Sequence, residues 1–140
     1  MKKPKIISVS NQKGGVGKTT TTINLATAMV SFNKKILIVD LDPQGNASTG
    51  LGIDLKERDK NIYKVMTSQT EVNDCVFDTI IPNLKIIPST IDLSAVEIEF
   101  SNIPKRELVL KKSFDNLTID FDYILIDCPP SLGLLTVNAM

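Results

Sequence analysis

Residues 5–19 read KIISVSNQKGGVGKT: a short apolar run rich in β-branched residues leads into a glycine-rich turn and then into the start of a helix. A strand, a glycine turn and a helix in this order present successive backbone N–H groups to phosphate oxygens. Glycines are required there because side chains would block the phosphate and because some of the positions need a positive φ. The segment therefore predicts a loop that binds the triphosphate of a nucleotide.

The predicted phosphate-binding residues run from the turn into the helix: Lys13, Gly14, Gly15, Val16, Gly17, Lys18, Thr19 and Thr20. Lys18 is expected to reach the β- and γ-phosphates, and the hydroxyl of Thr19 to coordinate Mg²⁺. The general form of this loop has a glycine five residues before Gly17, where this chain has Gln12. Lys13 adds a second cation, which can stabilise a transferring phosphoryl group as an arginine finger does. The alternative for the glycines is a flexible turn from strand to helix that binds no phosphate. The alternative for Lys13 is a solvated loop lysine without a role in catalysis.

The apolar runs at residues 5–10, 36–41 and 123–127, with a weaker one at 84–87, predict strands of a mostly parallel, twisted sheet that is buried on both faces. Apolar side chains recur at helical spacing through residues 18–32, so the chain is expected to open with a βαβ unit. Shorter helices are predicted at 61–67, 71–77, 92–101 and 105–117, and a last one after Pro130. The predicted fold class is α/β, a sheet flanked by helices.

The length of 140 residues and the apolar share of 42% suit a single folded domain. The sequence ends at Met140, inside the last predicted helix, which leaves the predicted sheet with an exposed edge. We therefore expect residues 1–140 to be the N-terminal portion of a longer nucleotide-binding domain.

Acidic side chains stand at the ends of two predicted strands, where parallel α/β sheets hold their ligands. Asp127 ends the run at 123–127 and is expected to hold Mg²⁺ together with Thr19, directly or through water. These two residues can meet at one ion only if strand 123–127 lies beside strand 5–10. The motif therefore also predicts part of the strand order.

Asp40 and Asp42 stand at the end of the run 36–41 and point to the same side if the chain stays extended. A carboxylate here could position the water that attacks the γ-phosphate, and Asp42 is the candidate for that role. Asp40 is a third candidate metal ligand, with capping of the following turn as the alternative. Together with Lys13 and Lys18, Asp42 makes up the predicted catalytic set.

Composition narrows the choice of function. Lys+Arg and Asp+Glu both number 16, so there is no overall basic field of the kind that attracts nucleic acid. The chain has no histidine, so carboxylates and lysines must carry any catalysis. Cys75 and Cys128 fit neither a disulfide framework nor a zinc site and are expected to be reduced thiols. No stretch approaches the ~18 apolar residues of a membrane span, and no signal peptide is visible, so a cytoplasmic protein without membrane contact is expected.

Several segments together resemble the ParA/MinD superfamily, whose deviant phosphate loop carries an extra lysine at its start. They are KGGVGKT at 13–19, DLDPQGN at 40–46, IPSTIDLSAVEIE at 87–99, and Asp127 followed by CPPSLG at 128–133. The resemblance covers essentially the whole chain. The DPQGN run at 42–46, which MinD proteins usually lack, favours the ParA/Soj partition ATPases. A relationship to the cluster-binding nitrogenase iron protein through Cys128 is the weaker alternative.

The resemblance implies a P-loop NTPase fold of the deviant Walker A type and slow hydrolysis of Mg-ATP, with ATP in place of GTP. It also implies that Lys13 reaches across a two-fold axis to the ATP of a second subunit, so that ATP holds a homodimer together. Asp42 then belongs to a first switch segment tied to hydrolysis, and residues 128–133 form a second. A ParB-type centromere-binding protein would stimulate turnover, and the nucleoid-associated dimer would bind DNA nonspecifically during chromosome or plasmid segregation.

Two other functions stay open. A MinD-like, membrane-cycling regulator of cell division would need a C-terminal amphipathic helix, which these residues do not supply. A nucleotide-binding assembly module would bind ATP without turnover. The DNA contacts of the family lie largely in the later half of the domain, so we interpret the local basic group as a solvated helix face: Lys105, Arg106, Lys111 and Lys112.

Overall fold

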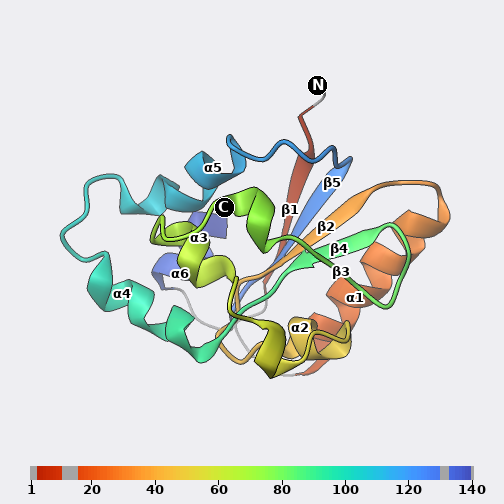
Figure 1. The fold of residues 1–140 in the computed structure, drawn as a ribbon, viewed down its shortest axis with the longest axis horizontal. Coiled ribbons are helices and arrows are strands. Elements are labelled where there is room, and N and C mark those ends of the chain that lie inside the picture. Colours follow the sequence, from red (N-terminus) through yellow and green to blue (C-terminus); the bar gives the residue numbers. More distant parts are fainter. Residues whose placement is uncertain (1–2, 11–15, 130–132, 140) are drawn as a thin grey trace.

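The computed structural model describes residues 3–10, 16–129 and 133–139. Its centre is a five-stranded sheet with the order β1-β5-β2-β4-β3 (Figure 1). The strands are β1 (Lys5–Val9), β2 (Ile36–Asp40), β3 (Phe77–Asp78), β4 (Leu84–Ile87) and β5 (Tyr123–Asp127). β1, β5, β2 and β4 run parallel to one another, and β3 runs antiparallel to β4.

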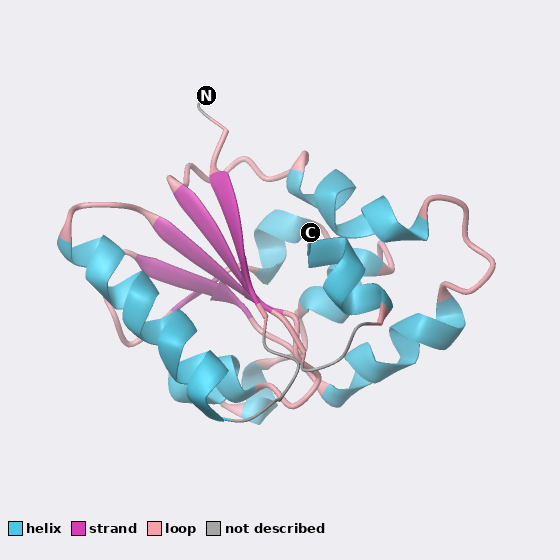
Figure 2. Cartoon of the chain, turned by 180° about the vertical axis from the view of Figure 1, so that it is seen from behind, coloured by secondary structure: helices cyan, strands magenta, loops and turns pink. Residues whose placement is uncertain are grey.

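Helices cover both faces of the sheet (Figure 1, Figure 2). On one face lie α1 (Val16–Ser31) and α2 (Asn46–Gly50), and on the other lie α3 (Ile62–Met66), α4 (Val96–Glu99), α5 (Val109–Phe114) and α6 (Leu134–Ala139). Short 3-10 turns join them: η1 (Leu55–Glu57), η2 (Val72–Cys75), η3 (Ile91–Ala95) and η4 (Arg106–Leu108). The predicted fold class, a mostly parallel sheet flanked by helices, is confirmed.

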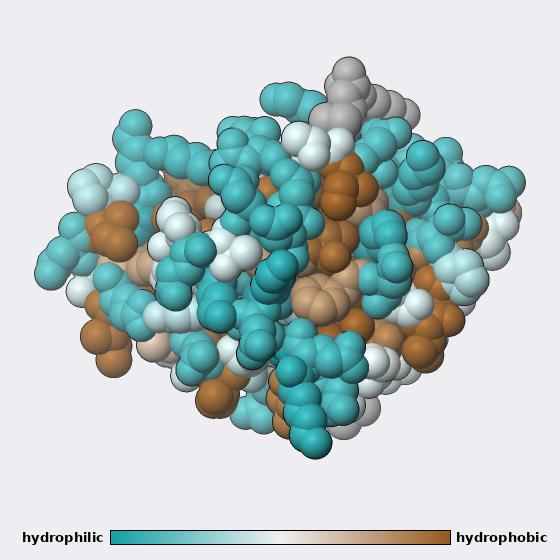
Figure 3. All heavy atoms as spheres, in the orientation of Figure 1, coloured by the Kyte–Doolittle hydropathy of each residue, from teal (hydrophilic) through white to brown (hydrophobic). Residues whose placement is uncertain are grey.

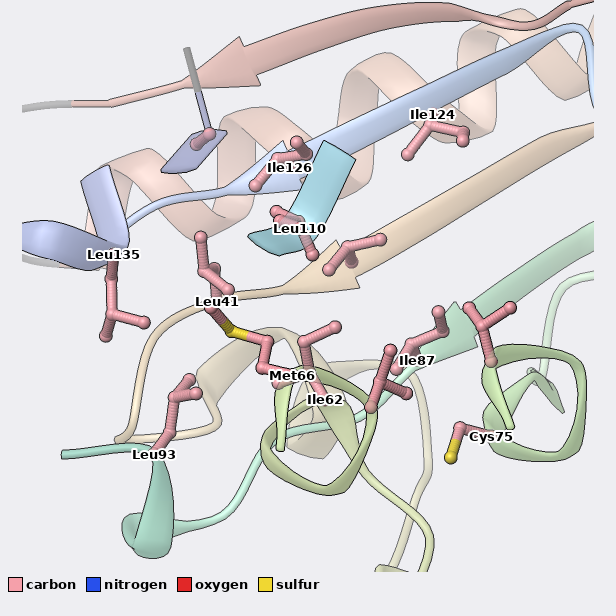
Figure 4. Close-up of a cluster of buried hydrophobic side chains, with 14 of the residues drawn as sticks. Leu41, Ile62, Met66, Cys75, Ile87, Leu93, Leu110, Ile124, Ile126 and Leu135 are labelled. Atoms are coloured by element: carbon pink, nitrogen blue, oxygen red, sulfur yellow. The ribbon is translucent and has the colours of Figure 1, made fainter. Parts of the chain in front are cut away.

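The centre of the sheet is apolar on both faces, as the sequence predicts, and all five residues of β2 are buried. Side chains alternate along a strand, so each strand serves two cores. Ile36 and Ile38 join the core under α1. Leu37 and Val39 join the larger core on the opposite face, part of which is drawn in Figure 4 between the strands and their covering helices.

The position of β5 between β1 and β2 confirms that strand 123–127 lies beside strand 5–10. β1 itself is less buried than predicted, and its Ile6 is 44% exposed. The reason is that β1 is an edge strand in the described sheet, while α1 packs mainly on β5, β2 and β4.

Other departures from prediction are local. β3 and α2 are absent from the sequence-based assignment because β3 has two residues and the NASTG sequence of α2 has no apolar periodicity. The helix predicted at 105–117 is shorter. Lys105 adopts a left-handed backbone with φ of 57°, and α5 begins only at Val109, after η4. The helix predicted at 92–101 is divided into η3 and α4.

The helices, the surface and the two cysteines bear on what the composition predicts. Within the described residues no helix is long and apolar enough to cross a bilayer. The face shown in Figure 3 is mostly hydrophilic, with hydrophobic side chains scattered between hydrophilic ones. Cys75 and Cys128 are both free, buried thiols, so they form no disulfide with each other.

Candidate nucleotide and metal site

The carboxyl ends of three parallel strands and the first turn of α1 meet at one edge of the sheet. In the strand register, Val9 is aligned with Asp127, and Asp127 with Asp40. By strand alternation the two aspartates share the face of Leu125 and Ile38, which is the face covered by α1 and α2. Both carboxylates are fully buried. The topology therefore places two acidic groups side by side beneath the start of α1.

Asp127 is held by two threonines of α1. Thr19 Oγ1 donates a hydrogen bond to Asp127 Oδ2 at 3.0 Å, and Thr22 Oγ1 donates to Oδ1 at 3.3 Å. Residues three apart lie on the same face of a helix, which is why both hydroxyls reach one carboxylate. The structure thus brings together Thr19 and Asp127, two of the three residues predicted as magnesium ligands. Thr22 was not predicted, although its spacing from Thr19 on the inner face of the helix is a signal that could have found it.

Asp40 accepts three hydrogen bonds from its own neighbourhood. Its Oδ1 accepts from the Asp42 amide at 3.2 Å, and its Oδ2 accepts from the Ser48 amide at 2.9 Å and the Ser48 hydroxyl at 2.6 Å. These bonds tie the end of β2 to the first turn of α2. They favour the capping role that the sequence left open, and a metal-binding role for Asp40 stays a prediction.

The pKa of Asp40 is raised from an ordinary value of 3.8 to about 6, chiefly by burial and in addition by the neighbouring Asp127 carboxylate, while hydrogen bonds from Ser48 and Asp42 partly oppose the rise. Because the pKa is higher in the folded state, protonation of Asp40 stabilises the fold. That contribution is fully present below about pH 4 and is lost as pH rises to about 6, an effect of roughly 3 kcal/mol. The carboxylate form of Asp40 is thus maintained at neutral pH at a cost in stability.

Replacing Ser48 by alanine is expected to raise the pKa of Asp40 above about 6, because the hydroxyl at 2.6 Å stabilises the charged form. The measurement is an NMR titration of the Asp40 carboxyl carbon. Ser94→Ala is a matched control, since the Ser94 hydroxyl is exposed and bonds to the Ile91 carbonyl at 2.7 Å. A pKa that stays in place or falls in the Ser48 variant would contradict the hydrogen-bond network.

Asp42, the predicted catalytic carboxylate, follows β2 in a tight turn and is 5% exposed. Its Oδ1 accepts from the Gln44 amide at 3.0 Å, as aspartate side chains commonly do in turns. Its carbonyl accepts from the Gly45 amide at 2.9 Å and from the Ser89 hydroxyl at 2.5 Å. Gly45 has φ of 67°, a left-handed conformation that favours glycine. The backbone around Asp42 is therefore fixed from both sides.

Part of the predicted phosphate loop lies outside the described residues, namely Lys13, Gly14 and Gly15, together with the side chains of Val16 and Lys18. Gly17, Thr19 and Thr20 are described in the first turn of α1. Among the described residues, no atom of another segment lies within 4 Å of the point where a Cβ on Gly17 would be. Within the described part of the chain, nothing therefore blocks the approach of a ligand to Gly17.

The oxygen atoms present suit a hard cation. No group of three or more His, Cys, Asp or Glu side chains in the described part of the chain could hold a metal ion on its own. Mg²⁺ does not require such a group, because it keeps several waters and is usually bound by one or two protein oxygens plus substrate phosphates. The hydroxyl of Thr19 and the carboxylate of Asp127 fit that requirement.

Comparison with known proteins gives consistent matches over nearly the whole chain. The AAA domain family (AAA_31) matches residues 4–140. The sporulation initiation inhibitor protein Soj of Bacillus subtilis is 47% identical over 136 residues, which is 97% of this chain and 54% of Soj. The chromosome partitioning protein ParA of Caulobacter vibrioides is 46% identical over 138 residues, 97% of this chain and 52% of that protein. The chain thus spans about half the length of the curated relatives it matches.

Solved structures match the fold at a similar coverage. Cobyrinic acid a,c-diamide synthase from Mycobacterium smegmatis, with bound ATP analogue and magnesium, has a TM-score of 0.92 and 36% identity, covering 98% of this chain and 56% of that one. A plasmid partition protein from Borrelia burgdorferi has a TM-score of 0.85 and 33% identity, covering 99% and 61% respectively.

Proposed function

Since the chain belongs to the AAA domain family, we propose that it carries the nucleotide site of an ATP-dependent partition protein that binds and slowly hydrolyses Mg-ATP. ParA relatives named as chromosome partitioning proteins and a matching plasmid partition protein support this assignment. In the full-length protein, ATP joins two copies into a dimer that binds nucleoid DNA nonspecifically. A ParB-type centromere-binding protein accelerates turnover, and the cycle drives DNA segregation in the cytoplasm.

The observation that carries the proposal is the contact between Thr19 and Asp127. Their 3.0 Å hydrogen bond joins the first turn of α1 to the end of β5, although 108 positions separate the two residues in sequence. The N-terminus of a helix favours phosphate through its backbone N–H groups and its dipole. A carboxylate directly beneath such a terminus suits a site that takes phosphate together with a cation.

Thr19 and Asp127 are the residues that would hold Mg²⁺, through a hydroxyl and a carboxylate oxygen. Once bound, the ion would neutralise charge on the β- and γ-phosphates. Thr22 keeps the Asp127 carboxylate oriented through its bond to Oδ1. The oxygens of Asp40 already accept bonds from Ser48 and the following turn, so Asp40 acts in support of the site.

Asp42 supplies the carboxylate for hydrolysis in this proposal. It orients the attacking water and can accept a proton from it. Lys18 of the same chain and Lys13 of a second copy stabilise the negative charge that develops on the transferring phosphoryl group. Residues 128–133 follow β5 directly and respond to loss of the γ-phosphate. This response separates the two copies of the dimer. A MinD-like function is not favoured, because the chain is similar to ParA of Caulobacter vibrioides and to a plasmid partition protein of Borrelia burgdorferi.

Replacing Thr19 by valine is expected to weaken ATP binding about tenfold or more in the presence of Mg²⁺. Valine keeps the shape of the side chain but removes the hydroxyl ligand, and hydrogen bonds to charged groups are worth ~1.5–3 kcal/mol. In EDTA the variant and the unmodified protein should bind ATP with the same affinity. The measurement is isothermal titration of the full-length protein with ATP, with and without Mg²⁺.

Thr27→Val is the matched control for this experiment. Thr27 is also a threonine of α1, but it is exposed and its hydroxyl bonds to the Ile23 carbonyl at 2.8 Å. This control should retain the full Mg²⁺ dependence. If Thr19→Val also retains it, Thr19 is not a magnesium ligand and the proposed site is wrong.

A further inference from the structure

Arg58, which follows η1, is a buried cation just behind the Asp42 turn, and only 3% of it is exposed. Its Nε and Nη2 donate to the Ile53 carbonyl at 3.0 and 2.6 Å, and Nη2 also donates to the Thr49 hydroxyl at 3.0 Å. Its Nη1 donates to the Ser89 carbonyl at 3.3 Å. The planar guanidinium therefore joins α2, the segment after α2 and the segment after β4, which a point charge such as lysine could not do.

Ser89 extends this network to the site and is itself fully buried. Its hydroxyl donates to the Asp42 carbonyl at 2.5 Å, and its amide donates to the Ser48 hydroxyl at 3.1 Å. Ser48 in turn donates to the Asp40 carboxylate at 2.6 Å. A continuous series of hydrogen bonds therefore runs from Arg58 through Ser89 to both aspartates.

Gly45 lies where the backbone of the turn comes closest to the Arg58 guanidinium. A Cβ on Gly45 would lie 2.6 Å from Arg58 Nη1 and 3.4 Å from the Ser89 carbonyl oxygen. The guanidinium thus lies directly against the backbone of the Asp42 turn (residues 42–45). The amide of Gly45 also donates to the Asp42 carbonyl at 2.9 Å, which closes the turn. A side chain at this position would push the turn away from Arg58.

We propose that Arg58 is a positioning residue for nucleotide hydrolysis: together with Ser89 it fixes the Asp42 turn and so aims the Asp42 carboxylate. The inference rests on the proposed function, because the part played by Asp42 in hydrolysis belongs to it. A residue that fixes a catalytic group in advance affects the rate of the chemical step more than the affinity for substrate. Arg58 acts through Asp42, and its four hydrogen bonds all go to backbone carbonyls or a threonine hydroxyl.

The test uses Ser89→Ala and Arg58→Lys in the full-length protein. Alanine removes the bond to the Asp42 carbonyl, and lysine keeps the positive charge but loses the fork that joins three segments. Both variants are expected to lower kcat for ATP about ten- to a hundredfold and to leave the ATP dissociation constant within about twofold. In the nucleotide-free protein, the Gly45 amide should exchange its hydrogen about tenfold faster, because the turn that protects it is loosened.

Two matched controls separate positioning from a general loss of structure. Arg106→Lys makes the same change at an exposed arginine, and Ser113→Ala removes a hydroxyl that bonds a carbonyl, that of Val109, at 2.9 Å. Both controls should keep kcat and Gly45 exchange unchanged. Unchanged Gly45 exchange in both test variants, or a fall in affinity equal to the fall in kcat, would overturn the inference.

If the proposed function is wrong, the experiment gives a result that differs from failure of the Arg58 inference. In that case the unmodified full-length protein hydrolyses no ATP, and kcat cannot be compared. Gly45 exchange then decides the question alone: faster exchange in Ser89→Ala and Arg58→Lys supports the fixing of the turn, and unchanged exchange rejects it.

Discussion

Replacing Asp42 by asparagine is expected to lower the rate of ATP hydrolysis about a hundredfold or more and to leave ATP affinity within about twofold. Asparagine can still accept the bond from the Gln44 amide, seen at 3.0 Å in the structure, so the turn should keep its shape. What is lost is the negative charge that orients water and accepts its proton. The measurement is single-turnover phosphate release with Mg²⁺ by the full-length protein.

Asp42→Ala should give the same loss of hydrolysis and should hold the protein as an ATP-bound dimer, which sedimentation can detect. Asp115→Asn is a suitable control, because Asp115 is exposed and lies just after α5, distant in sequence from the Asp42 turn and from Arg58. Unchanged phosphate release by both Asp42 variants would move catalysis to another carboxylate. Absence of release from the unmodified protein would instead favour an assembly module that binds ATP without turnover.

Replacing Lys18 by alanine is expected to abolish ATP binding, with a loss of affinity of about a hundredfold or more. The lysine at this position of a phosphate loop contacts the β- and γ-phosphates, and no other described residue of the first turn of α1 carries a positive charge. Titration with a fluorescent ATP analogue measures the loss. Lys34→Ala, at an exposed lysine beyond the end of α1, should bind normally. Micromolar affinity retained by the Lys18 variant would mean that the phosphate loop is assigned wrongly.

The parts of the site that could be predicted are those with strong local patterns. A β-branched run ending in Asp127 indicates a buried strand with a carboxylate at its end, and a glycine turn before Thr19 indicates a helix terminus. The expectation that Thr19 and Asp127 bind the same ion also predicted that β5 lies beside β1, as it does in the structure. The requirement that two ligands share one cation is a distance restraint, so it predicts topology as well as chemistry.

The parts that were missed depend on contacts between distant segments. Arg58 stands in the run Glu57-Arg58-Asp59-Lys60, which is typical of a solvated surface, yet it is buried because carbonyl oxygens of Ile53 and Ser89 converge on it. Nothing in the sequence around Arg58 indicates those partners. The low burial of β1 was missed for a related reason, since burial depends on what packs beside a strand as well as on its own residues.

The strand order also bears on how the protein is made. β1 leaves the ribosome first, but Lys5 pairs with Tyr123, and β5 is the strand beside β1 in the described sheet. Such distant pairing forms late, because a long loop must close before any contact repays the loss of entropy. A nascent chain that ends before Tyr123 has a complete glycine loop but lacks the carboxylate of Asp127. We therefore expect the proposed Mg-ATP site to become complete only after almost all of these residues have been translated.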